Sequence, residues 1–416
     1  MEGAGGGKIM NATESFIQTH RSDDVRKLAF ASHPADIDLP FALSQISGRQ
    51  AIKNKIPSWH ENDHIIYPKH LSLEQCSSEA TAKYKATLVK GESLADLTGG
   101  FGVDCAFMSR QFKSTTYIER SEELCKIAEN NFNVLGLNHI QVVCGQAVDY
   151  LEKISEVDCI FLDPARRDGV GEKVVAIQDC EPNIVELKEQ LLNKAETVMI
   201  KLSPMLDISL ALQSLPETTA IHVVSVNGEC KELVFIVTPP PTPSKGGQRH
   251  FERSEKTNED FQITCINILK NGTIQEFSFL KSEEQQCNIN YASELRKFIY
   301  EPNASILKAG AYKTIAHKFN LKKLHLDSHL YTSDQLVENF PGRVFRFVSS
   351  FSFNKKEIKE NLKNVEQANI SIRNFPGSVD ELRKKLKLKD GGDIYLFATT
   401  LYDGRKVILK VESNRL

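Results

Sequence analysis

Short apolar runs alternate with helix-forming stretches between residues 93 and 202, and this alternation constrains the fold more than any other feature. Strands that alternate with helices form a parallel sheet covered on both faces, so such strands are apolar throughout. Further along, Asn227-Gly228 separates two more apolar runs and predicts a tight antiparallel hairpin. We therefore predict a doubly wound α/β domain with seven strands, at residues 94–97, 114–118, 140–143, 157–162, 198–202, 222–226 and 232–237.

The chain has 416 residues, too many for one domain of about 100–200 residues. Residues before the sheet read as helical, and a proline- and glycine-rich stretch after it cannot bury a core. Asn271-Gly272 predicts a second hairpin, and helices are expected at 291–299 and 304–319. The expected parts are a helical region, the sheet domain, a flexible linker, a hairpin-led segment and a small α+β domain, at residues 1–90, 91–238, 239–260, 261–336 and 340–416.

Cysteine usage and hydropathy exclude several classes of protein. The nine cysteines are odd in number and include no Cys-x-x-Cys pair, so neither a metal site nor a disulfide framework is expected. No apolar run approaches the roughly 20 residues that a membrane-spanning helix needs. Residues 1–10 lack the apolar core of a secretory signal, so we expect a cytoplasmic protein with free thiols.

The formal net charge of −2 hides an asymmetry along the chain. Residues 1–303 carry 31 Lys and Arg against 42 Asp and Glu, a net charge of −11. Residues 304–416 carry 21 against 12, a net charge of +9. A basic module on an acidic body is typical of proteins that contact a polyanion. A solvated helical face explains such basic residues equally well, so charge alone leaves nucleic-acid binding open.

A glycine-rich loop, with Asp96, Thr98, Gly99, Gly100 and Gly102, follows the first strand and opens a helix. Glycines at this place let the backbone turn tightly and approach a ligand. The spacing differs from the Gly-x-Gly-x-x-Gly of dinucleotide-binding loops, and a carboxylate at the loop would repel a pyrophosphate. The same carboxylate would attract the ammonium group of an amino acid, which favours S-adenosylmethionine over a nicotinamide cofactor.

Glu119 ends the next strand, 17 residues after Gly102. A carboxylate there can accept hydrogen bonds from both hydroxyls of a ribose, as in adenosine sites at the carboxyl ends of parallel strands. The alternative is a glycine turn that binds nothing, and Glu119 weighs against it.

A third element, Asp163-Pro164-Ala165-Arg166-Arg167, follows the fourth strand, where cofactor and substrate are expected to meet. The proline restricts the backbone on both sides, so a rigid turn could hold the carboxylate near a transferred methyl group. The arginines could bind a phosphate or carboxylate through paired hydrogen bonds. The plainer alternative is ion pairing within the chain, to Asp168, Glu172 or Glu181.

With these three elements the chain resembles the class I S-adenosylmethionine-dependent methyltransferases, which have a Rossmann-like sheet. The glycine loop, Glu119 and the Asp163-Pro164 turn match the first, second and fourth motifs of that family. The resemblance implies that Glu119 binds the ribose of the cofactor. It implies further cofactor contacts for Asp96, Thr98, Gly99, Gly100, Gly102 and Arg120, and for Gln146 and Ala147 beside the adenine.

The resemblance is closer to a bacterial subgroup with a C-terminal THUMP-like domain. The phrases that carry it include Lys201-Leu202-Ser203-Pro204, Glu301-Pro302-Asn303 and Arg373-Asn374-Phe375-Pro376. In that subgroup a short ferredoxin-like segment, here about 288–336, precedes the THUMP-like module. THUMP domains proper bind RNA, so the resemblance implies a base in structured RNA (tRNA or rRNA) as the substrate.

Methyl transfer is an in-line displacement, which requires alignment of the acceptor and removal of its proton where it has one. We expect Asp163, Pro164, Arg166 and Lys201 to form the catalytic side of the cleft. No aromatic residue follows Pro164, which disfavours methylation of an exocyclic amino group. Cys180 is a candidate for a covalent step, although a structural role is favoured. The remaining alternatives are a protein or small-molecule acceptor, and an inactive RNA-binding protein on the same fold.

Overall fold

The computed structural model describes residues 11–166, 177–240 and 261–413. The described residues form two compact units. The first contains residues up to Thr218 together with 235–240, and the second contains Thr219–Val234 and the residues from 261 onward. No helix in the described part of the chain combines the length and apolarity that a membrane span requires. Most of the expected linker, residues 241–260, lies outside the described residues.

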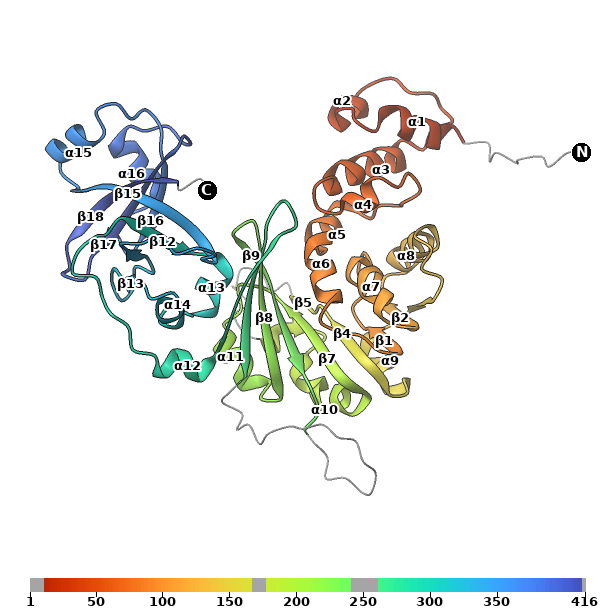
Figure 1. Cartoon of the computed structure of the whole chain (residues 1–416). Coiled ribbons are helices and arrows are strands. Elements are labelled where there is room, and N and C mark those ends of the chain that lie inside the picture. Colours follow the sequence, from red (N-terminus) through yellow and green to blue (C-terminus); the bar gives the residue numbers. More distant parts are fainter. Residues whose placement is uncertain (1–10, 167–176, 241–260, 414–416) are drawn as a thin grey trace, which may run out of the picture. The chain divides into compact units, whose positions relative to one another are not determined.

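The large sheet has the strand order β11-β10-β8-β9-β7-β4-β1-β2-β3 (Figure 1). Strands β3, β2, β1, β4 and β7 pair in parallel, each with its neighbour. The predicted α/β fold and its seven strands are therefore confirmed. The strands are β1 (Ser93–Asp96), β2 (Ser114–Glu119), β3 (Ile140–Cys144), β4 (Val157–Leu162), β7 (Ala195–Leu202), β8 (Thr218–Val226), β9 (Glu229–Val237), β10 (Gln262–Ile268) and β11 (Ile274–Leu280).

Both predicted hairpins are present. Asn227 and Gly228 between β8 and β9 have φ angles of 52° and 80°, as a two-residue turn with two left-handed positions requires. Strands β10 and β11 pair antiparallel around Asn271-Gly272. Because β10 also pairs in parallel with β8, this hairpin extends the large sheet, whereas we expected it to lead the ferredoxin-like segment.

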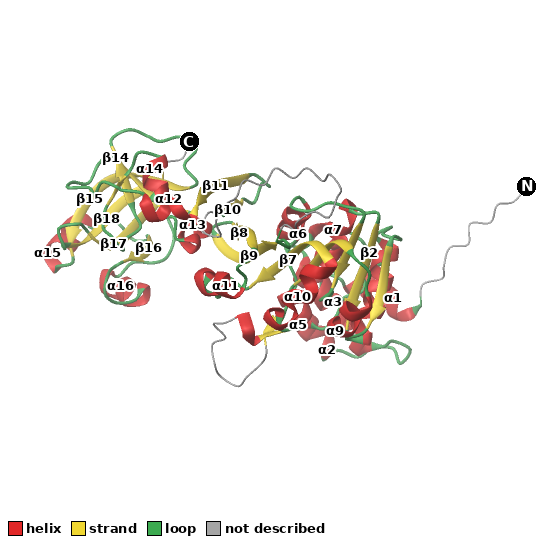
Figure 2. Ribbon diagram, turned by 90° about the horizontal axis from the view of Figure 1, so that it is seen from below, coloured by secondary structure: helices red, strands yellow, loops and turns green. Residues whose placement is uncertain are grey.

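Helices fill the chain before the sheet and alternate with its strands, and Figure 2 shows them on both sides of the strands of the first unit. Polar side chains begin several of them, as with Ser121, whose hydroxyl accepts from the amide of Leu124. The helices of this unit are α1 (Ala12–His20), α2 (Val25–Ala29), α3 (Leu39–Ile52), α4 (Pro57–His60), α5 (His70–Gln75), α6 (Glu79–Ala86), α7 (Val103–Met108), α8 (Glu122–Val134), α9 (Ala147–Lys153), α10 (Ile184–Lys194) and α11 (Ile208–Ser214).

The path of the chain through the parallel strands determines where a ligand can bind. From β1 the chain runs outward through β2 and β3, and then returns to β4 on the other side of β1. The loops that leave the carboxyl ends of β1 and β4 therefore diverge, and ligands of open α/β sheets bind at such a switch point.

The second unit contains a further sheet with the order β13-β14-β12-β15-β18-β17-β16. Its strands are β12 (Phe298–Pro302), β13 (Lys322–Lys323), β14 (Tyr331–Ser333), β15 (Gly342–Ser352), β16 (Asn369–Arg373), β17 (Ile394–Thr400) and β18 (Lys406–Ser413). Its helices are α12 (Lys281–Gln286), α13 (Ala304–Ala309), α14 (Thr314–Lys318), α15 (Lys355–Asn361) and α16 (Val379–Leu386). From residue 342 onward the elements follow the predicted order of strands and helices.

Two predicted helices of this unit are wrong in type or length. The helix expected at 291–299 is absent, because Ala292 donates its amide to Lys323 and Ile299 pairs with Phe345 of β15. The helix expected at 304–319 is divided at Gly310, whose φ of 76° ends α13 in a left-handed conformation. Sheet pairing with distant segments overrode the local pattern in the first case.

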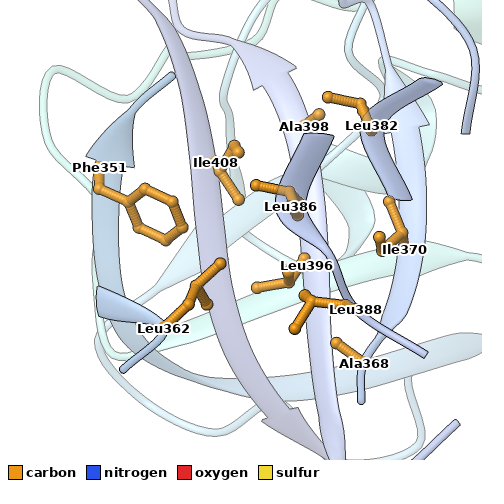
Figure 3. Packing of buried hydrophobic residues seen from close by; sticks show 10 residues of the cluster. All are labelled: Phe351, Leu362, Ala368, Ile370, Leu382, Leu386, Leu388, Leu396, Ala398 and Ile408. Carbon is orange, nitrogen blue, oxygen red and sulfur yellow. The ribbon is translucent and has the colours of Figure 1, made fainter. Parts of the chain in front are cut away.

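The core of the last module lies between α16 and strands β16, β17 and β18 (Figure 3). Leu382 and Leu386 are one helical turn apart on α16 and pack against the cluster that contains Ile370 and Leu396. Burial of a leucine side chain contributes about 1.5–3 kcal/mol relative to exposure, so this helix depends on its apolar face.

Truncation of that face gives a testable prediction. Leu382, which is 3% exposed, leaves a cavity when replaced, and we expect Leu382→Ala to destabilise the module by about 2–5 kcal/mol. Leu326→Ala, at a site 58% exposed in the same unit, should change stability by less than about 0.5 kcal/mol. Hydrogen exchange of the β17 and β18 amides in increasing urea measures both, and equal effects would contradict the packing described here.

Candidate active site

The glycine loop joins β1 to α7, and close packing explains its composition. A Cβ atom on Gly99 would lie 2.1 Å from the ring of Tyr117, so only glycine fits there. Gly102 precedes α7 with a φ of 84°, a left-handed conformation that other residues rarely adopt. The phenol of Tyr117 donates to the carbonyl of Gly100 at 2.5 Å, which fixes the turn against β2.

Glu119, at the end of β2, is turned toward this loop. One carboxylate oxygen accepts from the amide of Gly100 at 2.9 Å, and the other accepts from the amide of Ser121 at 2.8 Å. A carboxylate offers about four acceptor sites, so each oxygen keeps one for a further donor. The arrangement is therefore compatible with a vicinal diol that donates to both oxygens.

Asp96 is the last residue of β1, directly before the loop, and is only 1% exposed. Its carboxylate accepts from the amide of Thr98 at 3.0 Å. Burial raises the pKa of Asp96 well above its usual value; the bond from Thr98 opposes this rise, and the negative charges of Asp104, Asp163 and Glu119 add to it. A cation close to Asp96 would reverse the effect, so the carboxyl is suited to respond to an ammonium group.

Thr98 connects the two loops of the switch point. Its hydroxyl oxygen accepts from the amide of Asp163 at 2.6 Å, which ties the end of β4 to the loop after β1. The carboxylate of Asp163 is 35% exposed and forms an ion pair with Lys201, from the end of β7. Pro164 is buried directly after it. The structure thus brings Asp163, Pro164 and Lys201 together beside the glycine loop.

The arginines predicted at the site are only partly described. Arg120 is 58% exposed and pairs at 2.8 Å with Glu181, the acid that we considered as a partner for Arg166 or Arg167. The backbone of Arg166 belongs to the short strand β5 (Ala165–Arg166), which pairs antiparallel with β6 (Cys180–Glu181). The side chain of Arg166, and all of Arg167, Asp168 and Glu172, lie outside the described part of the chain.

Gln146 and Ala147 lie at the end of β3, where α9 begins. Gln146 is exposed and precedes α9 without capping it through its side chain. The amide of Gly145, just before it, donates to the backbone carbonyl of Glu119 at 2.9 Å, so this turn is held at the end of β2. Both residues therefore lie at the same edge of the sheet as Glu119.

Two cysteines, Cys180 and Cys76, differ in their surroundings near the site. Cys180 is 3% exposed within β6, where its backbone pairs with Arg166, in agreement with a structural role. Cys76, which sequence reasoning did not select, is close enough to Asp104 and Lys201 for their charges to act on it. Burial raises the pKa of Cys76, so the group is held as a thiol. Within the described ranges, no cluster of His, Cys, Asp and Glu could hold a metal ion.

Comparison with known proteins identifies the family to which the chain belongs. Residues 79–214 match the family described as Conserved hypothetical protein 95, residues 298–341 match a ferredoxin-like domain, and residues 342–412 match a THUMP domain-like family. The crystal structure of a "putative methyltransferase" from Porphyromonas gingivalis W83 is 34% identical, with a TM-score of 0.85, over 97% of this chain and 98% of that one. The chain belongs to the class I S-adenosylmethionine-dependent methyltransferases, in the subgroup with a C-terminal THUMP-like domain.

Weaker similarities extend to other proteins. An rRNA methylase from Streptococcus thermophilus is 12% identical to the methyltransferase, with a TM-score of 0.29, over 38% of this chain and 95% of that one. A SAM-dependent methyltransferase from Agrobacterium tumefaciens is 14% identical, with a TM-score of 0.27, over 39% and 61%. These TM-scores are too low to support a conclusion about substrate. No curated protein matches the chain.

The buried carboxyl of Asp96 gives a prediction for the free methyltransferase. Because the folded-state pKa is raised, stability is lost as the pH rises from the unfolded-state pKa, about 4, through the folded-state pKa. Asp96→Asn keeps an acceptor for the amide of Thr98 and removes this loss. We therefore expect the variant to match the wild type in urea at pH 4 and to be more stable at pH 8.

The exposed Asp149 on α9 supplies the control for this experiment. Asp149→Asn should leave the difference from the wild type independent of pH. If Asp96→Asn were no more stable than the wild type at pH 8, the carboxyl would not be buried as described.

Proposed function

We propose that the methyltransferase transfers a methyl group from S-adenosylmethionine to a base in structured RNA. The observation that carries the cofactor assignment is the carboxylate of Glu119, fixed by two backbone amides at the carboxyl end of β2. One oxygen contacts the glycine loop at the switch point, and both oxygens retain acceptor capacity for a ribose diol.

The residues around the switch point fit S-adenosylmethionine chemically. The glycine loop brings backbone close to a ligand, and a Cβ on Gly100 would meet only the carbonyl oxygen of Thr98, at 3.8 Å. The buried carboxyl of Asp96 suits an ammonium group. In this proposal Asp96, Thr98, Gly99, Gly100 and Gly102 hold the methionine part, Glu119 the ribose, Gln146 and Ala147 the adenine, and Arg120 borders the adenosine.

When bound, the cofactor supplies a sulfonium methyl group that an electron-rich acceptor atom can attack. Asp163 orients the acceptor and accepts its proton where it carries one. Lys201 holds the carboxylate in place through their ion pair, and Pro164 keeps the turn rigid. Arg166 is proposed to bind a phosphate of the acceptor strand.

The proposal that RNA is the acceptor rests on two features of the C-terminal third of the chain. Residues 342–412 match the THUMP domain-like family, and residues 304–416 carry a net charge of +9. Such a charge attracts a phosphate backbone, and the affinity that it supplies falls steeply with salt. A protein or small-molecule acceptor would not need this module, which is why RNA is preferred.

Glu119 provides the test of the cofactor site. Glu119→Gln keeps one carbonyl acceptor but loses the charge and the second acceptor, and hydrogen bonds to charged groups contribute about 1.5–3 kcal/mol. We expect the dissociation constant for S-adenosylmethionine, measured by calorimetry, to rise about 10- to 100-fold. Glu122→Gln, an exposed site in the first turn of α8, should bind as the wild type does. Unchanged binding by Glu119→Gln would remove the ribose contact from the proposal.

Mass spectrometry of nucleosides tests the substrate. RNA from cells that lack the gene should lose one methylated nucleoside, and the wild-type gene should restore it. Asp163→Ala should not restore it, whereas the surface variant Asp149→Ala should. A nucleoside profile unchanged by loss of the gene would favour a protein or small-molecule acceptor, and absence of S-adenosylmethionine binding would favour an inactive RNA-binding protein.

A further inference from the structure

We propose that Lys85, Asp104 and Ser77 form a buried positioning device that holds Lys201 against Asp163 during methyl transfer. The inference rests on the proposed function, because it assigns the device to the reaction at Asp163. It extends the active site to α6 and to the segment before it.

The described contacts form a chain of alternating charges. The ammonium of Lys85, which is 0% exposed, lies 3.2 Å from Oδ1 of Asp104. The hydroxyl of Ser77 donates to Oδ2 of Asp104 at 2.6 Å and lies 3.3 Å from the ammonium of Lys85. The same Oδ2 lies 3.8 Å from the ammonium of Lys201, which also pairs with Asp163.

Asp104 and Asp163 therefore compete for Lys201. Asp104 is 10% exposed and Asp163 is 35% exposed, so Asp104 is the less hydrated carboxylate and has the greater need of a cation. Although burial alone would raise the pKa of Asp104, Lys85 and then Lys201 lower it below its usual value. Lys85 pairs with Oδ1 of Asp104 and Ser77 donates to Oδ2, and Lys201 lies nearer to Asp163 than to Asp104.

The local structure explains why these residues meet. Ser78 caps α6 by accepting from the amide of Thr81, and Ser77 stands directly before this cap. Lys85 lies two turns along the helix, on the buried face that packs beside α7 (Figure 1). Asp104 is in the first turn of α7, immediately after the glycine loop. The loop that is proposed to hold the cofactor thus also fixes Asp104.

Lys85→Met is the principal test, because it removes the charge and retains an unbranched chain. We expect Lys201 to shift from Asp163 toward Asp104. The assay measures transfer of a tritiated methyl group to RNA isolated from cells that lack the gene. In this assay kcat should fall about 10- to 100-fold, as for small misplacements of a catalytic group. The dissociation constant for S-adenosylmethionine should stay unchanged. Ser77→Ala is a milder change and should also lower kcat, by a smaller factor.

A second substitution separates positioning from general damage. In Lys85→Met combined with Asp104→Asn, the competing carboxylate is gone, so Lys201 should return to Asp163 and kcat should recover. Lys83→Met is the matched control, since Lys83 lies on the same helix, pairs with Glu79 at 2.6 Å and is 61% exposed. It should retain wild-type kcat. A double variant no more active than Lys85→Met would overturn the proposal.

A crystal structure of Lys85→Met tests the positioning role without an activity measurement. If Lys85→Met kept Lys201 on Asp163, the positioning role would be wrong whatever the enzyme methylates. If Lys85→Met does not fold, Ser77→Ala decides, and wild-type kcat in that variant contradicts the proposal. A wild-type enzyme that transfers nothing to RNA would instead refute the proposed substrate, while the crystallographic outcome would still stand.

Discussion

The hydrogen bond from the amide of Asp163 to the hydroxyl of Thr98 is the contact on which the site depends. It crosses the switch point of the sheet and ties the loop after β1 to the turn after β4. On one side of it lie the glycine loop and Glu119, and on the other lie Asp163 and Lys201. Because both loops are held at one point, the sides proposed for the cofactor and for the acceptor keep a defined separation, which an in-line displacement requires.

The charges around this contact would be unfavourable in an ordinary core. Asp96 and Asp104 are both buried, and a buried carboxylate is costly unless cations or hydrogen-bond donors compensate it. Asp104 has Lys85 and Ser77, whereas Asp96 has the amide of Thr98 and a raised pKa. The unequal compensation agrees with the proposed division of roles, in which Asp104 helps to position Lys201 and Asp96 binds a positively charged ligand.

Much of the fold could be read from local pattern. Strand β4 and helices α10 and α16 begin and end at the predicted residues, because their apolar periodicity and capping residues are clear. Two of the failures share one cause, namely pairing with distant segments. Residues 291–299 have a helical composition, but Ala292 and Ile299 form backbone contacts with segments far along the chain, which no local pattern records. The hairpin β10–β11 was recognised, and only its pairing with β8 was not.

The same division holds for the site. The sequence alone was enough to select the glycine loop, Glu119 and the Asp163-Pro164 turn as candidate site residues. Backbone geometry demands glycine and proline at particular positions, and these motifs are short. Only the folded chain revealed that Asp96 is buried, that Glu181 pairs with Arg120, and that Lys85 and Ser77 converge on Asp104. Burial and ion pairing depend on which segments, far apart in the sequence, come together in three dimensions. The linear order of the residues does not give the distances between such segments in the folded protein.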